Sequence, residues 1–483
     1  RHRSRSNDRF DTQMIANGVL LILFALLAGI ASYTMYAHNI LAFRHVNVIY
    51  TAVLVVVFLV CLLLTLFKKG KHLVTVLLVL FSIVVGVSLF AFKSLVDVAD
   101  NINKTASYSE IEMKVVVPAN SSISDVSELT NVQAPTSADE SNINALIANI
   151  KSEKGVELTV DPVDSYQSAY ENLINGSSQA MVLNSSYSSL LELSYNDYES
   201  NLKTIYTYKI KKAIEDTAKT TDKNVFNIYI SGIDTSGAVS TVSRSDVNLI
   251  LTVNMNTHKI LMTTTPRDSY VRIPDGGADQ YDKLTHAGIY GIETSVKTLE
   301  NLYDIPINYY ARLNFTSFVK LINALGGVTV YNDQAFTSLH GNYNFGVGNI
   351  NLTSGEEALG FVRERYSLEH GDYDRGNNQL KVIQAIIEKL TSFQSVSNYS
   401  DVISTLQDSI QTNMPLNTMM SLVNEQLDSG KTFIFSSQEV TGTGSTGQLT
   451  SYAMPNASLY MIQLDDASVA KASQAIKNVM EGK

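Results

Sequence analysis

The sequence predicts three N-terminal transmembrane helices followed by two α/β domains, a small one and a larger one with a mixed sheet flanked by helices. Three observations support this prediction. Long apolar runs occupy the N-terminal part, short strand and helix patterns alternate after it, and alternating apolar strands with amphipathic helices fill the rest. We therefore divide the chain into residues 1–97, 98–215 and 216–483.

The three apolar runs are long enough to cross a bilayer. They are Met14–Tyr36, Val46–Phe67 and Leu73–Phe92, and none contains an Asp, Glu, Lys or Arg. A helix needs about 20 such residues to span the hydrocarbon core. Neither a signal peptide nor an ordinary buried helix explains three such runs in succession, so we expect a multi-pass protein of the cell membrane.

Basic residues flank these runs unevenly. The loop between the first two runs contains only Arg44, whereas most basic residues precede the first run or separate the second from the third. These residues are Arg1, Arg3, Arg5, Arg9, Lys68, Lys69 and Lys71. The positive-inside rule then places the N-terminus in the cytoplasm and everything after about residue 95 outside.

Charge and cysteine content narrow the function classes. Residues 1–96 hold nine Lys/Arg and two Asp/Glu, which leaves 27 basic and 44 acidic residues for the rest of the chain. An exterior this acidic argues against nucleic acid as a partner. The only cysteine, Cys61, lies in the second apolar run, so the exterior is neither a disulfide scaffold nor a Cys-zinc site.

The smaller domain follows a polar stretch, residues 98–110, that we expect to form a short stalk. Its pattern alternates strands and helices and predicts a small α/β unit. The predicted strands are 113–117, 156–160, 180–183 and 205–210, and the predicted helices are 142–150 and 166–174. No chemically suggestive group of residues stands out in it.

The larger domain begins with three predicted strands whose ends are polar. In the first, apolar residues alternate at 226, 228 and 230, and the strand ends at Asp234. The second begins just after Asp246. The third covers 260–265 and ends before Pro266, so Arg267 lies just beyond its end. If neighbouring strands are antiparallel, these side chains meet at one edge of the sheet with Arg244.

Helices are predicted after these strands. Residues 293–303 form one, and 315–325 form another with Asn314 as its N-cap. A capping box at 353–356 begins a third, and apolar residues at helical spacing over 380–390 mark a long helix after Arg375. We expect a flexible loop at 441–447 and a terminal helix at 468–479.

Two carboxylates close to two arginines suit a magnesium-bound pyrophosphate. Mg²⁺ takes one or two carboxylates and completes its octahedron with phosphate oxygens and water. The arginine fork matches phosphate oxygens in a bidentate manner. The alternative is a surface salt bridge between Asp246 and either Arg244 or Arg267, which is the commoner arrangement for any single such pair.

A second cluster follows the capped helix. Arg363 and Arg365 lie at its end, and Arg375 and Gln379 are four residues apart, so they share a helical face. A helix terminus or an extended segment would let both arginines of the first pair point inward. The alternative is a solvated, salt-bridged face, since Glu364, Asp372 and Asp374 are close in sequence.

These residues carry a resemblance. The spacing Arg363-x-Arg365, then Gly371-Asp372-Tyr373-x-Arg375-x-x-Asn378-Gln379, resembles the signature of the LytR–CpsA–Psr family. Residues 265–271, 283–287, 290–291, 314–315 and 325–328 match further motifs of that family in the same order. The resemblance covers about residues 224–391. The three-helix anchor with the extra α/β domain resembles the CpsA type found with capsule biosynthesis in Gram-positive bacteria, so the resemblance implies a Gram-positive cell envelope.

The resemblance implies an enzyme that transfers a capsular or other cell-wall glycopolymer from a polyprenyl-pyrophosphate carrier to peptidoglycan with Mg²⁺. The implied catalytic residues are Arg267, Asp246, Asp372 and Arg375, with either Asp372 or Asp246 as the base. The implied pyrophosphate ligands are Arg244, Arg267, Arg363, Arg365, Arg375, Gln379 and Lys297, and the metal carboxylates are Asp234 and Asp246. The chain departs from the pattern at Asn378, where many members have Arg, and at Leu380, where many have Gln.

Other functions remain open at this stage. A regulator could bind the polyprenyl pyrophosphate without cleaving it, and a pyrophosphatase would use water as the acceptor. A membrane-tethered transcription regulator is disfavoured, because about five residues between the second and third runs cannot hold a DNA-reading fold. The absence of a nucleophile elbow, a P-loop and an HExxH motif from the sequence disfavours a serine hydrolase, an NTPase and a zinc protease. The apolar faces of 315–325 and 380–390 could line a lipid tunnel or simply pack in the core.

Overall fold

The computed structural model describes residues 12–215, 222–233, 239–394, 396–407 and 409–483. These residues form two compact units. The helical unit contains the described residues up to Asn101 together with those of 392–404 and 415–431. The α/β unit contains the described residues of 102–391, 405–414 and 432–483.

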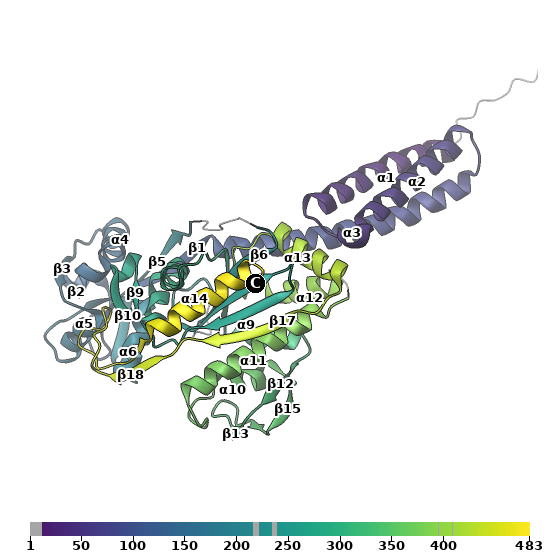
Figure 1. Ribbon diagram of the computed structural model, residues 1–483. Coiled ribbons are helices and arrows are strands. Elements are labelled where there is room, and N and C mark those ends of the chain that lie inside the picture. The colour runs from purple at the N-terminus through teal and green to yellow at the C-terminus, as the bar shows by residue number, and fades with distance from the viewer. Residues whose placement is uncertain (1–11, 216–221, 234–238, 395, 408) are drawn as a thin grey trace, which may run out of the picture. The chain divides into compact units, whose positions relative to one another are not determined.

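Three long helices dominate the helical unit and lie side by side in Figure 1. They are α1 (Thr12–Ala37), α2 (Val46–Leu66) and α3 (Lys71–Ala106), and each is long and apolar enough to cross a membrane. Phe24 of α1, Cys61 of α2 and Leu78 of α3 are fully buried between them. The outward-facing side chains are also mainly apolar, as expected for helices surrounded by lipid.

The predicted polar stalk at residues 98–110 is wrong. Helix α3 continues without a break to Ala106, and strand β1 begins at Tyr108. Leu95, Ala99 and Ile102 recur at helical spacing and are each less than 5% exposed, so apolar burial extends the helix beyond its uncharged part.

Two further helices of the helical unit were not predicted. They are α12 (Val396–Leu406) and α13 (Leu416–Ser429). Met420 of α13 packs in an apolar cluster with Met35 and Phe92. The amide of Asn424 joins α13 to the turn after α1, since its nitrogen donates to the carbonyl of Asn39 at 2.7 Å and its oxygen accepts from the backbone N–H of Phe43 at 3.3 Å.

The N-terminal part of the α/β unit is a five-stranded mixed sheet with helices, which we call the accessory domain. Its strand order is β3-β2-β4-β1-β5, with β1 antiparallel to both of its neighbours. The strands are β1 (Tyr108–Pro118), β2 (Asn131–Ala134), β3 (Thr159–Pro162), β4 (Met181–Asn184) and β5 (Leu202–Ala213). The helices are α4 (Thr136–Lys154), α5 (Tyr166–Ile174) and α6 (Ser188–Ser194).

The larger domain is built on a six-stranded mixed sheet of order β16-β11-β6-β7-β8-β17. The strands are β6 (Val225–Ile233), β7 (Ser245–Asn254), β8 (Lys259–Thr264), β11 (Tyr309–Asn314), β16 (Ile410–Thr412) and β17 (Ile434–Glu439). The predicted antiparallel pairing of the first three strands is confirmed, whereas β11 and β17 run parallel to β6 and β8. The ends of β6, β8, β11 and β17 therefore share one edge of the sheet with the start of β7.

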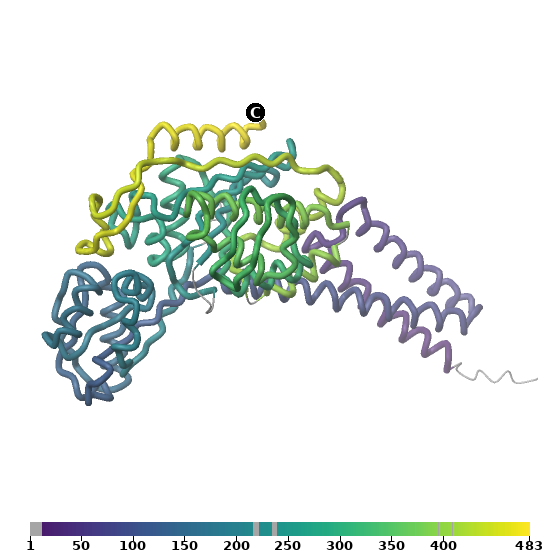
Figure 2. Tube along the Cα trace, turned by 90° about the horizontal axis from the view of Figure 1, so that it is seen from below, coloured from purple at the N-terminus to yellow at the C-terminus, as the bar shows by residue number. Residues whose placement is uncertain are grey.

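Helices cover both faces of this sheet (Figure 1). On one face lie α8 (Ile292–Tyr303) and α14 (Asp466–Met480), and Figure 2 shows α14 in yellow along the outside of the domain. On the other lie α9 (Phe315–Ala324), α10 (Gly355–Arg363) and α11 (Asp372–Thr391). The short helix α7 (Leu284–Ala287) packs against β7.

Short two-stranded sheets complete the α/β unit. They are β9 (Tyr270–Ile273) with β10 (Gln280–Lys283), β12 (Val328–Asn332) with β15 (Gly348–Leu352), β13 (Phe336–Thr337) with β14 (Asn344–Phe345), and β18 (Gly442–Thr446) with β19 (Tyr460–Leu464). The predicted loop at 441–447 is therefore mostly strand. Its Gly and Thr residues pair along the backbone with β19, which propensity alone does not reveal.

Candidate active site

The polar edge of the six-stranded sheet opens into a pocket of about 440 Å³. Its lining divides by chemistry into a charged group and an apolar group. The charged and amide residues are Arg244, Asp246, Arg267, Arg363, Arg365, Arg375, Gln379 and Asn314. The apolar residues include Ile230, Val247, Leu313, Phe315, Phe318, Leu321, Leu359, Val362, Ile383 and Ile386. Among the residues that the structure describes, five arginines and one carboxylate line the pocket, so it is a local cationic site in a chain whose net charge is −10. We call it the arginine pocket.

Arg267 and Asp246 form the ion pair at the centre of this edge. An Arg267 terminal nitrogen lies 2.8 Å from Asp246 Oδ2, and the Thr285 hydroxyl donates to Asp246 Oδ1 at 3.1 Å. The backbone N–H of Thr285 also donates to the carbonyl of Arg267 at 2.9 Å. Helix α7 therefore fixes both partners where β7 begins and β8 ends.

A second carboxylate lies behind Arg267. Asp268 Oδ1 is 2.6 Å from Lys283 Nζ and 3.7 Å from Arg267 Nε. Burial acts to raise the pKa of Asp268, but the charges of Lys283 and Arg267 outweigh it and hold the pKa below its ordinary value. Asp268 is thus ionised at neutral pH and orients the arginine from the side away from the pocket.

The Lys283-to-Ala287 motif has a structural role at this edge. His286 is fully buried, with Nδ1 2.8 Å from Asp282 Oδ1, and Ser451 donates to the same oxygen at 2.6 Å. The charge of His286 and these hydrogen bonds overcome burial and lower the pKa of Asp282. Asp282 therefore joins β10, α7 and the segment before β19.

Arg244 is held by close backbone packing. It is only 5% exposed and immediately precedes β7. A Cβ on Gly288 would lie 2.5 Å from the carbonyl oxygen of Ser243 and 3.0 Å from the backbone carbon of Arg244, so only glycine lets these segments approach so closely.

Arg312 supports the same segment from β11. Its guanidinium is buried and donates to the carbonyls of Val239 at 3.0 Å and Thr241 at 2.9 Å. Burial lowers the pKa of Arg312 to about 10, which still leaves it charged at neutral pH. Arg312 is thus a positioning residue for the backbone that presents Arg244.

Arg363 and Arg365 reach the pocket because helix α10 ends between them. Glu364 is extended and its buried carboxylate accepts backbone N–H groups from Leu339, Arg365 and Ser367 at 2.7–2.9 Å. Burial acts to raise the pKa of Glu364, and these backbone donors outweigh it and lower the pKa. The predicted end of the helix is confirmed, and an extended residue between the arginines lets both line one pocket.

Aromatic rings support these two guanidinium groups. The Arg363 guanidinium carbon lies 4.2 Å from the centroid of the Phe315 ring, and that of Arg365 lies 4.5 Å from the Tyr366 ring. Arg365 also donates to the Tyr366 hydroxyl. Stacking of this kind orients a guanidinium and leaves its N–H edge for an anion.

Helix α11 contributes Arg375, Gln379, Ile383 and Ile386 to the pocket. Their spacing of three or four residues places them on one face, with the charged residues near the N-terminus of the helix. The helix begins three residues before Arg375 rather than after it. Gln379 Nε2 also donates to the carbonyl of Val362 at 3.4 Å, which links α11 to α10.

Of the predicted site residues that the structure describes in full, Lys297 is the one that is not in this lining. Lys297 lies on α8 and is paired with Asp275 at 3.0 Å, away from the pocket residues. Asp234 lies outside the described residues, and so does the side chain of Asp372. Within the described part of the chain, no group of three or more His, Cys, Asp or Glu residues could hold a metal ion.

Sequence reasoning missed several residues of the site. Tyr366 is 75% exposed at the pocket, and Leu193 of the accessory domain is 46% exposed there. Tyr366 directly follows Arg365, and that adjacency was a usable signal. Leu193 and the buried Arg312 gave none, because their importance depends on strand order and on contact between distant segments.

Comparisons with known proteins identify the family of this chain. The model of the LytR–CpsA–Psr family (LytR_cpsA_psr) matches residues 192–468. A relative in Enterococcus faecalis, named polyisoprenyl-teichoic acid–peptidoglycan teichoic acid transferase TagU, is 32% identical over 57% of this chain and 87% of its own. A relative of the same name in Oceanobacillus iheyensis is 35% identical over 47% of this chain and 69% of its own.

Two further matches are less informative. The crystal structure of B. subtilis TagV covers 54% of this chain and 99% of its own at 25% identity, with a TM-score of 0.47. A model described as DNA polymerase processivity factor matches residues 68–183, a stretch that includes all of the apolar helix α3. The family match over more than half of the sequence shows that this chain belongs to the LytR–CpsA–Psr family.

Proposed function

We propose that this chain is an extracytoplasmic transferase that attaches a capsular or other cell-wall glycopolymer to peptidoglycan. The donor is the glycopolymer on a polyprenyl-pyrophosphate carrier. The observation that carries the proposal is a single pocket that combines five arginines with a continuous apolar lining. The relatives named as teichoic acid transferases support the same class of reaction.

The charged part of the pocket suits a diphosphate. Arg244, Arg267 and Arg375 come from the sheet edge and α11, and Arg363 and Arg365 come from the end of α10. Guanidinium forks from several directions can satisfy many phosphate oxygens at once. A cationic, partly buried setting also strengthens each contact relative to water.

The apolar part suits the prenyl chain of the carrier. Phe315, Phe318 and Leu321 of α9 face the same pocket as Ile383 and Ile386 of α11. A prenyl chain in contact with these side chains would place its diphosphate among the arginines. Part of each predicted apolar face is used for ordinary packing, since Ile322 and Leu380 are buried and do not line the pocket.

The proposed reaction is a phosphoryl-type transfer. A muramic acid hydroxyl oxygen attacks the phosphorus that carries the polymer, and the bond from that phosphorus to the bridging oxygen breaks. The products are a polymer–peptidoglycan phosphodiester and a prenyl monophosphate, and the hydroxyl proton goes to Asp246 or Asp372. The arginines stabilise the charge that develops on the phosphate oxygens and on the leaving group.

Mg²⁺ is part of this proposal, and Asp246 with Asp234 would hold it. Asp246 offers a carboxylate within the pocket, and one or two carboxylates are what Mg²⁺ uses when phosphate oxygens supply other ligands. When bound, Mg²⁺ would neutralise charge on the transferring phosphate. The present partners of Asp246, Arg267 and Thr285, would share its oxygens with the ion.

We also propose on which side of the membrane the α/β unit lies. The three apolar helices anchor the chain in the cell membrane. The distribution of Lys and Arg around them places the α/β unit outside, where both peptidoglycan and the exported carrier lipid are present.

The proposal is tested with the full chain in detergent and a synthetic polyprenyl-pyrophosphate glycan. Release of prenyl monophosphate and formation of glycan-bearing peptidoglycan are followed with and without Mg²⁺. Transfer that requires both peptidoglycan and Mg²⁺ is expected. Binding without cleavage would identify a regulator instead, and equal cleavage without peptidoglycan would identify a pyrophosphatase.

A further inference from the structure

A second pocket, of about 500 Å³, lies in the accessory domain between α5 and the segment that follows α6. Its volume falls within the range of about 300–1,000 Å³ common for small-molecule sites. We call it the accessory pocket. Its lining residues are Tyr170, Glu171, Ile174, Asn175, Tyr195, Asp197 and Asn201.

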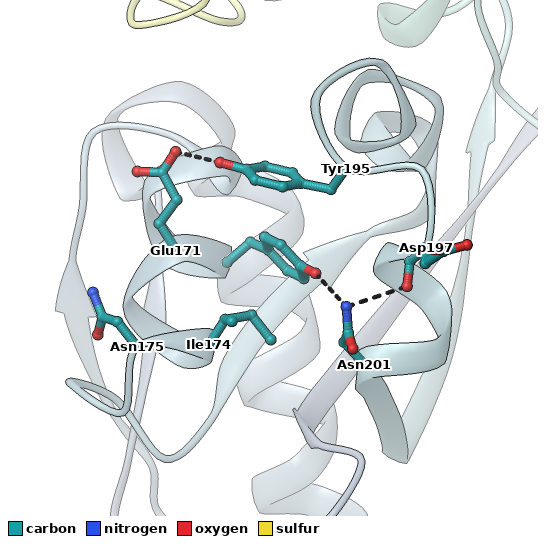
Figure 3. Close-up of a pocket in the computed structure, with 7 residues that line it drawn as sticks. Glu171, Ile174, Asn175, Tyr195, Asp197 and Asn201 are labelled. Atoms are coloured by element: carbon teal, nitrogen blue, oxygen red, sulfur yellow. Dashed lines mark hydrogen bonds between the residues drawn. The ribbon is translucent and has the colours of Figure 1, made fainter.

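The walls of the accessory pocket combine apolar faces with planar polar groups (Figure 3). The rings of Tyr170 and Tyr195 lie 4.8 Å apart at an angle of 47°, and the Ile174 side chain is 48% exposed next to them. Aromatic and aliphatic faces of this kind suit the C–H face of a sugar ring. Tyrosine hydroxyls, amides and carboxylates can pair with the sugar hydroxyls at its edge.

Internal hydrogen bonds hold these polar groups in place. The Tyr195 hydroxyl donates to Glu171, and Gln167 Nε2 donates to the same carboxylate oxygen at 3.0 Å. Asn201 Nδ2 donates to the Tyr170 hydroxyl at 3.2 Å, as Figure 3 shows by a dashed line. The walls are thus ordered before a ligand arrives, which lowers the entropic cost of binding.

The negative charge of the accessory pocket favours neutral glycans over anionic ones. Glu171 and Asp197 are its charged lining residues, and the described lining contains no Lys or Arg. Two carboxylates would repel a phosphate-rich polymer. A neutral glycan, such as a strand of N-acetylated hexosamines, meets no such penalty.

The accessory pocket is adjacent to the arginine pocket along the chain. Leu193, at the end of α6, lines the arginine pocket, and Tyr195 lines the accessory pocket two residues later. Two residues span at most about 7 Å. The main chain therefore holds a residue that lines the accessory pocket within about 7 Å of one that lines the arginine pocket, measured between their Cα atoms.

From these observations we infer that the accessory pocket binds a neutral N-acetylhexosamine glycan and places the acceptor strand beside the arginine pocket. The role as an acceptor subsite rests on the proposed transferase function, whereas glycan binding itself does not. The pocket uses ring stacking and hydrogen bonds, and its two carboxylates exclude phosphate-bearing polymers.

Binding is tested with the full chain in detergent and an N-acetylglucosamine tetrasaccharide, measured by calorimetric titration. Ile174→Arg introduces a long side chain into the pocket from an exposed position at the end of α5, where a cation suits the helix dipole. We expect the dissociation constant to rise about tenfold or more, equivalent to about 1.4 kcal/mol. Ser152→Arg, on the exposed surface of α4, is the matched control and should leave it unchanged.

Two further measurements distinguish a glycan from other ligands, and loss of glycan binding from loss of the proposed donor site. Glu171→Gln keeps the shape of the pocket, so it should change tetrasaccharide binding less than twofold, whereas a cationic peptide would lose affinity. Equal tetrasaccharide binding by Ile174→Arg and the parent would overturn the inference, and so would binding of a phosphate-rich polymer only. Ile174→Arg should still bind geranyl pyrophosphate normally, so loss of glycan binding alone leaves the proposed donor site intact.

Discussion

The arginine pocket and the accessory pocket differ in how the chain builds them. The arginine pocket draws its lining from residues between Leu193 and Ile386, and the six-stranded sheet brings them to one edge. The accessory pocket uses one short stretch, from Tyr170 to Asn201. The first therefore depends on the whole domain, and the second on α5 and the segment that follows α6.

The two pockets also have opposite charge. Within the described residues, five arginines and one carboxylate line the first pocket, whereas two carboxylates and no cation line the second. Adjacent pockets of opposite sign can keep two substrates from exchanging places, because each repels the charge that the other attracts. This difference yields four predictions.

The largest expected effect separates the two pockets directly. Arg267→Ala removes a guanidinium from the proposed diphosphate site, and loss of one such donor costs about 10²–10³-fold in rate. Transfer and geranyl pyrophosphate binding should both fall, while tetrasaccharide binding stays within twofold. Arg375→Ala serves as a second variant, because it does not disturb the pair with Asp246. If both variants lost geranyl pyrophosphate binding and tetrasaccharide binding equally, the two pockets would not be independent sites.

Asp268→Asn should destabilise the α/β unit at neutral pH. It removes a buried partner of Lys283 and Arg267, at a cost of about 3 kcal/mol. Because the pKa of Asp268 is lowered in the fold, its stabilisation is present above about pH 4 and is lost as the pH falls through the folded value.

Thermal melting followed by circular dichroism measures this effect. The melting temperature should fall by roughly 5–10 °C at pH 7, and the gap from the parent should narrow in acid. Asp275→Asn is the matched control, since it removes the charge from the exposed pair with Lys297, leaves an amide oxygen for the Thr294 hydroxyl, and should cost less than about 1 kcal/mol. A gap that is independent of pH would mean that the charge of Asp268 is not responsible.

Arg312→Lys should lower transfer about tenfold without touching a ligand. A lysine keeps the charge but cannot reach two carbonyls with a planar fork, so the segment from Val239 to Arg244 loosens. Faster hydrogen exchange in that segment is the readout that separates positioning from general instability. Arg272→Lys, at an exposed arginine that donates to the carbonyl of Asp279, is the control. Unchanged exchange with lowered activity would refute the positioning role.

Lys297→Ala should have the smallest effect. Lys297 pairs with Asp275 on the surface of α8, and such pairs contribute about 0–1 kcal/mol. We expect diphosphate binding and transfer to change less than twofold. A tenfold loss of diphosphate affinity would instead return Lys297 to the ligand set that the family resemblance implies.

Much of the fold could be predicted from sequence patterns. Alternating apolar residues marked β6, β7 and β8. Helical spacing with Asn314 as N-cap marked α9, and a capping box at 353–356 marked α10, whose N-cap in the structure is Ser354. Antiparallel pairing then predicted that Asp246, Arg244 and Arg267 share an edge, and all three line one pocket. Local periodicity was sufficient there because strand ends are fixed by strand direction.

Other features could not be predicted because they depend on distant contacts. The extension of α3 to Ala106 and the helices α12 and α13 depend on tertiary packing rather than on a strong local pattern. Leu193 reaches the arginine pocket through the association of two domains, and β18 becomes a strand only by pairing with β19. The accessory pocket has no sequence motif, since Tyr, Asn and Glu are common on any surface.

Glu364 has a consequence for how this family can diversify. Its carboxylate binds backbone N–H groups, so the bend between Arg363 and Arg365 does not rely on either arginine tip. Replacing an arginine at these positions would change which head group the pocket binds, while the main-chain conformation stays the same. New substrate preferences could then arise by single substitutions of Arg363 or Arg365, provided that Glu364 is retained.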